Sequence, residues 1–96
     1  MSDFIVVALA QAKPGFEAAL VAAQAALVLE ARKQPGCILY ELHADENQPG
    51  KVVFFERWSD RAAWQNHITG PHIHAFNAEA GDWLAHSELL QMRQVA

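Results

Sequence analysis

Three ionisable side chains have the type and the surroundings that proton transfer needs. Glu56 lies between apolar residues on one face of a β-branched and aromatic run, where a carboxylate is costly unless it is hydrogen-bonded or paired. His72 follows Pro71 at the expected start of a helix, where the dipole disfavours a cation and favours a neutral imidazole able to accept a proton. With His67, which closes the preceding segment, these residues are our candidate acid–base groups.

Each of these three residues also has a purely structural interpretation. Glu56 would then bind a backbone amide, or Arg57 or Arg61 of a second copy of the chain. His72 would cap or pack locally at the start of its helix, and His67 would be a packed structural residue. Residue types and spacing leave both interpretations open.

Aromatic residues near these groups could form a flat wall for a planar ligand. The candidates are Tyr40, Phe54, Trp58 and Phe76. Phe54 and Trp58 share a strand face with Glu56 by period-two counting, and Phe76 follows His72 by four residues on one helix face. Tyr40 falls on a predicted core face, from which its hydroxyl could reach a cavity. Alternatively, the Trp58 indole fills an interface between two copies.

The histidines at 67, 72 and 74 raise the question of a metal site. Their spacing matches no compact zinc motif, and Pro71 prevents a single helix from carrying all three. His74 is expected to point into solvent. The five glycines are scattered at element ends rather than gathered in a phosphate-binding loop. We therefore expect neither a metal nor an organic cofactor.

Short apolar runs and turn signals predict the elements that must position these residues. Strands are expected over 4–10, 37–44, 51–58 and 83–92. An alanine-rich helix is expected over 16–34, a short helix that Ser59 caps extends to residue 67, and Pro71 opens another that Gly81 ends. The order is β-α-β-β-α-β, a ferredoxin-like α+β arrangement with an antiparallel sheet, in one domain over residues 1–96.

The predicted first and third strands are apolar on both faces, which has consequences for association. Hydrophobic residues make up 52% of the 96 residues, a large share for so short a chain. Helices can cover one sheet face only, and leaving the other in water forgoes about 25 cal/mol per Å² of apolar area. Monomers rarely expose such a patch. We therefore expect a homodimer in which sheet faces sheet, with a ligand cavity on the inner sheet face that depends on the twin subunit.

Composition excludes several other partners. The net charge of −4 and the lack of a basic run argue against nucleic acid. No apolar stretch approaches the roughly 20 residues that cross a bilayer, so no membrane is expected. The N-terminus lacks the pattern of a signal peptide, and Cys37 is the single cysteine, so we predict a cytoplasmic location.

Several local patterns, taken in order, resemble one known family. They are Lys13-Pro14-Gly15, the segment 34–42, Glu56-Arg57-Trp58-Ser59-Asp60, then His67, Gly70-Pro71-His72 and Phe76. Over nearly the whole chain this set is similar to the antibiotic biosynthesis monooxygenase domain family. The resemblance implies a dimeric α+β barrel, and in many members the oxygenation of quinols or polyphenols without metal or flavin. It also implies that Trp58 lines the cavity. Heme-degrading members carry an asparagine on the first strand, and residues 4–10 contain none.

The resulting hypothesis is a cofactor-independent monooxygenase that acts with molecular oxygen on a quinol or a similar small aromatic substrate. His72 or His67 would be the base, Glu56 would orient it or the substrate, and Trp58 and Phe76 would form the wall. Two alternatives remain: an isomerase or lyase of a small metabolite in the same barrel, and a non-enzymatic dimer that binds a small ligand.

Overall fold

Four strands and three α-helices follow one another in the order β-α-β-β-α-α-β in the computed structural model, which describes residues 3–96. The elements are β1 (Phe4–Ala12), α1 (Glu17–Ala31), β2 (Cys37–Ala44), β3 (Lys51–Trp58), α2 (Arg61–Ile68), α3 (Pro71–Ala80), the 3₁₀ turn η1 (Gly81–Trp83) and β4 (Leu84–Met92). The ferredoxin-like α+β prediction is confirmed, with α2 and α3 together in the place of the second helix. Within residues 3–96, no helix has the length and apolarity that crossing a membrane requires.

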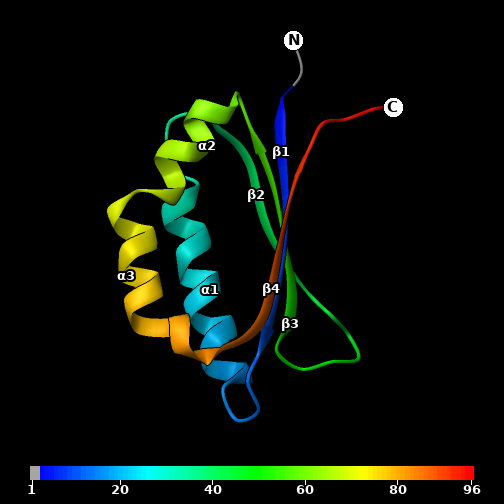
Figure 1. Cartoon of the computed structure of the whole chain (residues 1–96), viewed down its shortest axis with the longest axis vertical. Coiled ribbons are helices and arrows are strands. Elements are labelled where there is room, and N and C mark those ends of the chain that lie inside the picture. The colour runs from blue at the N-terminus through cyan, green and yellow to red at the C-terminus, as the bar shows by residue number, and fades with distance from the viewer. Residues whose placement is uncertain (1–2) are drawn as a thin grey trace.

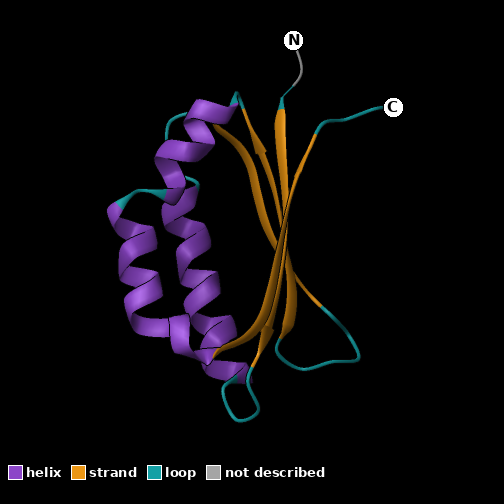
Figure 2. Ribbon diagram, in the orientation of Figure 1, coloured by secondary structure: helices purple, strands orange, loops and turns teal. Residues whose placement is uncertain are grey.

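The strands form one antiparallel sheet in the order β2-β3-β1-β4. All three helices lie on the same face of this sheet, and the other face is left without a covering layer (Figures 1 and 2). The strands predicted over 37–44 and 51–58 have the observed bounds. The last strand, β4, lies at a sheet edge and begins at Leu84 because residues 81–83 form the 3₁₀ turn.

Some element ends differ from the prediction for identifiable reasons. Helix α1 ends at Ala31, because the next amides bond three residues back: the Lys33 N–H to Glu30 and the Gln34 N–H to Ala31. Gly36, with φ of +84°, then turns the chain into β2.

The start of α2 corrects the predicted cap. Asp60, rather than Ser59, is the N-cap residue, and its carboxylate accepts a hydrogen bond of 2.8 Å from the Ala63 N–H. The helix begins at Arg61, one residue later than expected, so the side chain that reaches the third helical N–H belongs to Asp60.

Strand alternation separates a dry sheet face from an open one. The residues Val6, Ala10, Val52, Phe54 and Trp58 are buried against the helices. Their sequence neighbours Val7, Leu9 and Phe55 point to the opposite face, where they are only partly covered within one chain. As expected, β1 and β3 therefore carry apolar residues on both sheet faces, and the helices cover one of these faces.

Candidate functional site

A cavity of about 250 Å³ lies between the helix-facing side of the sheet and the helices. Five of the seven side chains expected at the site line it: Tyr40, Phe54, Glu56, His67 and Phe76. The other polar lining residues are Gln24, Asn77, Ser87 and Glu88, and the remainder of the wall is largely apolar. These lining residues come from one chain, and the dependence of the cavity on a twin subunit stays a prediction.

Strand pairing and helix placement explain why these side chains meet. Tyr40 of β2 stands directly opposite Glu56 of β3, and both point towards the helices. Phe54 lies two residues before Glu56 and therefore on the same face. His67, in the last turn of α2, packs its ring 5.5 Å from the ring of Tyr40, measured between centroids. Phe76 reaches the cavity from α3.

Glu56 is a buried carboxyl group with a specific partner. The Trp58 indole N–H donates a hydrogen bond of 2.9 Å to Glu56 Oε1. Burial raises the pKa of Glu56 to about 7, although hydrogen bonding to Trp58 and then to Tyr40 opposes the rise. Burial, followed by the nearby charge of Glu56, also raises the pKa of Tyr40 far above its ordinary value. At neutral pH, Glu56 is therefore poised between its two protonation states, and the phenol of Tyr40 stays neutral.

The arginines proposed as partners of Glu56 have other contacts. Arg57 donates to the Asp3 carboxylate at 3.1 Å, and Arg61 donates to Gln91. The pairing of Glu56 with an arginine of a second copy is therefore wrong, because Glu56 is buried on the helix side of its own chain.

Trp58 lies behind the cavity rather than in its wall. Its side chain is 0% exposed, and its ring centroid is 4.9 Å from that of His67 and 6.3 Å from that of Tyr40. The interpretation in which the indole fills a dimer interface is wrong, since the indole points towards its own helices. Its hydrogen bond makes Trp58 a support for Glu56, and its position does not favour direct stacking on a ligand.

The two candidate histidines contact each other. His67 Nδ1 and His72 Nε2 are 2.8 Å apart, so one ring donates a hydrogen bond to the other. Burial, and secondarily the proximity of His72, lowers the pKa of His67 to about 4. His67 is therefore neutral at pH 7 and a weak base.

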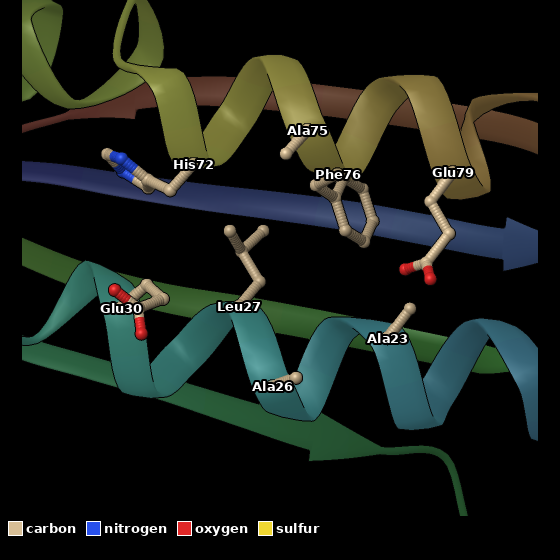
Figure 3. Close-up of a pocket in the computed structure, with 8 residues that line it drawn as sticks. All are labelled: Ala23, Ala26, Leu27, Glu30, His72, Ala75, Phe76 and Glu79. Carbon is tan, nitrogen blue, oxygen red and sulfur yellow. The ribbon is translucent and has the colours of Figure 1, made fainter.

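His72 faces a different hollow from His67. It lines a groove of about 310 Å³ between α1 and α3, shown in Figure 3, where Phe76 points towards α1 and Glu30 and Glu79 contribute carboxylates. The His67–His72 pair thus joins the cavity to this more open groove. Of the histidines considered for a metal site, His74 is exposed, and no cluster of three or more potential ligands occurs within residues 3–96.

Sequence reasoning missed Gln24, a polar cavity residue that is 1% exposed. It lies four residues after Leu20 and four before Val28, in the buried stripe of α1. The polar residue at helical spacing within an apolar stripe was the signal that could have identified it.

Together, the sheet with helices on one face and the buried carboxyl–tyrosine–histidine cluster define a small α+β domain with an acid–base cavity. The sequence model described as "Antibiotic biosynthesis monooxygenase" matches residues 3–79. The chain belongs to this family.

Individual relatives agree with this assignment. The Mycobacterium tuberculosis protein Rv0793, whose name designates it a candidate monooxygenase, is 31% identical to this chain over 83 residues, which are 86% of this chain and 81% of that protein. The Synechocystis sp. protein sll1783 is 31% identical over 84 residues, which are 88% of this chain. The chain spans only 57% of the length of sll1783.

Solved structures show the same fold over the full length of the chain. The crystal structure of PA3566 from Pseudomonas aeruginosa superposes with a TM-score of 0.94 at 28% identity, and covers 100% of this chain and 97% of that one. The structure of Rv0793 superposes with a TM-score of 0.89 at 27% identity, and covers 99% and 97% of the two chains. These proteins are similar to this chain in fold and sequence.

Proposed function

We propose that this protein is a monooxygenase that oxidises a quinol or a related phenol without a cofactor. The observation that carries the proposal is the buried carboxyl of Glu56, with a pKa of about 7, in a cavity with aromatic and apolar walls. A base whose pKa lies near the working pH is best suited to remove a phenolic proton. The family membership supports an oxygenase reaction class.

The reaction balances with the substrate as the only reductant. A hydroquinone and one O₂ give a hydroxyquinone and one water. One oxygen atom forms a new bond to a ring carbon that loses its hydrogen, and the other oxygen atom leaves as water. All four electrons that O₂ gains come from the ring. Deprotonation makes the ring electron-rich enough to start this transfer, so the main task of the protein is to take a proton and exclude water.

The roles of the side chains follow from their positions. Glu56 takes the phenolic proton, while the Trp58 N–H holds its carboxylate in place. Tyr40 stays a neutral hydrogen-bonding group beside Glu56. His67 is too weak a base for the first proton transfer, and His72 does not line the cavity, so the role of base moves from the histidines to Glu56. The His67–His72 pair offers a route by which a proton leaves towards the α1–α3 groove.

Oxygen uptake by chelator-treated protein with a panel of quinols tests the proposal. Wild type is expected to consume oxygen and release a hydroxyquinone, and Glu56→Gln is expected to lose at least about a hundredfold in kcat, as for the loss of a general base. Gln65→Met, a change at an exposed residue of α2, is the control. Uptake that disappears with the chelator would refute cofactor independence, and an unchanged rate in Glu56→Gln would refute the role of Glu56.

The polar part of the cavity wall favours a second candidate, an isomerase or lyase of a small hydroxy-carbonyl metabolite. Gln24, Asn77 and Ser87 add hydrogen-bonding groups to the cavity that a purely aromatic ligand does not need. Glu56 would then move a proton next to a carbonyl. Exchange of substrate protons in D₂O without oxygen uptake would favour this candidate. The inward-facing Glu56 and His67 argue against a purely non-enzymatic binding dimer.

A homodimer is the second part of the proposal. The sheet face opposite the helices carries Val7 and Leu9 of β1, Phe55 of β3, and Leu90 and Met92 of β4, the last two each 47% exposed. A second copy that packs its own sheet against this face would remove a contiguous apolar patch from water.

A further inference from the structure

Gln24 has a buried polar atom that no protein group within residues 3–96 satisfies. The side chain lies on α1, between Leu20 and Val28, and faces the sheet. Its Oε1 is buried and has no hydrogen-bond partner among residues 3–96. Burying a polar group without a partner destabilises the fold, and an apolar side chain of similar size would avoid this cost. The orphaned oxygen therefore points to a group that is supplied from outside the chain.

The cavity is where such a group would arrive. Gln24 lines the same cavity as Glu56, Tyr40 and His67. Gln24 belongs to the helix layer and Glu56 to the sheet layer, so the two polar groups enter the cavity from opposite sides. A ligand that bridges them needs one hydroxyl for Glu56 and a second hydrogen-bond donor for Gln24.

We infer that Gln24 is a specificity-determining residue that accepts a hydrogen bond from a second hydroxyl of a dihydroxylated aromatic ligand. The inference rests on the proposed function only in assuming that an aromatic ligand occupies the cavity. Selectivity arises because a ligand with one hydroxyl leaves the Gln24 oxygen unpaired, whereas a suitably spaced diol satisfies it.

Binding of matched small probes tests this assignment. Three proteins are compared: wild type, Gln24→Met and the exposed control Gln65→Met. Each is titrated in oxygen-free buffer with phenol, catechol, resorcinol and hydroquinone, and binding is measured by NMR. In wild type and in the control, at least one diol is expected to bind about five- to tenfold more tightly than phenol, as one added hydrogen bond allows. In Gln24→Met this preference is expected to disappear while phenol binding is unchanged.

A second measurement separates this role from a structural one. Because methionine removes an unpartnered buried group, Gln24→Met is expected to unfold at the same or a higher urea concentration than wild type. Lower stability together with an unchanged diol preference would show that Gln24 is structural, satisfied by internal water. Failure of wild type to prefer any diol would also overturn the inference. Diol-selective binding without oxygen uptake would leave the inference standing and refute the oxygenase proposal.

Discussion

At the scale of single residues, the protonation of Glu56 links chemistry to stability. Burial makes the charged form costly, so the folded state holds its proton at a pH where the unfolded chain has released it. The unfolded pKa is about 4.5 and the folded pKa about 7. Between these values the native state binds more protons, and its stability therefore falls as the pH rises.

Glu56→Gln should remove this dependence while keeping an acceptor for the Trp58 indole. Relative to wild type, the variant is expected to gain stability as the pH rises from about 4.5 to 7, by roughly 3 kcal/mol at most. Urea unfolding of both proteins across this pH range measures the difference. A constant difference in the free energy of unfolding would mean that Glu56 titrates at its ordinary pKa.

His67 should make the stability of the fold depend on pH in the opposite direction from Glu56. Its pKa is lowered from 6.5 to about 4 in the folded state, so the unfolded chain binds more protons between these values. The stability that the buried, neutral His67 contributes to the folded state is therefore lost as the pH falls from about 6.5 to 4. We predict that the His67 imidazole titrates with a midpoint near pH 4, and side-chain NMR measures this titration. A midpoint near 6.5 would contradict the buried, neutral state of His67.

At the scale of elements, the junction between α2 and α3 sets the position of the histidine pair. Gly70 is the N-cap of α3, and a Cβ added there would lie 2.7 Å from Cε1 and 2.9 Å from Nδ1 of His72. The absence of a side chain at this residue therefore lets the His72 ring fold back towards His67. The backbone of Gly70 has a φ of −76°, which other residues adopt freely.

Gly70→Ala should displace the His72 ring without unfolding either helix. Loss of the contact with His72 is expected to raise the pKa of His67 modestly, because the proximity of His72 lowers it. Imidazole NMR reports both the lost hydrogen bond and the shifted titration. Gly81→Ala is the matched control, because a Cβ there meets nothing within 4 Å. Equal His67 titrations in the two variants would disprove the role of Gly70.

At the scale of the whole molecule, the proposed homodimer depends on the sheet face that the helices leave open (Figure 1). Leu90→Glu places a charge on the apolar sheet face, beside Val7 of β1, and the proposed dimer is expected to dissociate in sedimentation experiments. Leu29→Glu is the control, since Leu29 is 59% exposed on α1, away from that face. Wild type that sediments as a monomer at high concentration would refute the dimer.

The sequence by itself determined the order of the elements, the bounds of β2 and β3, and the set of acid–base and aromatic residues near the site. These features depend on local periodicity and turn residues, which are visible along the chain. The ordered motifs also indicated the family that the comparisons show.

Only the tertiary structure decided which of these side chains share a space. Trp58 and Glu56 lie on one strand face, but the packing of α2 buries the indole and leaves the carboxyl facing the cavity. The separation of His72 from the cavity and the burial of Gln24 depend on how α1 and α3 rest on the sheet. Periodicity assigns a residue to a face, whereas exposure and pKa depend on the atoms that other elements bring against it.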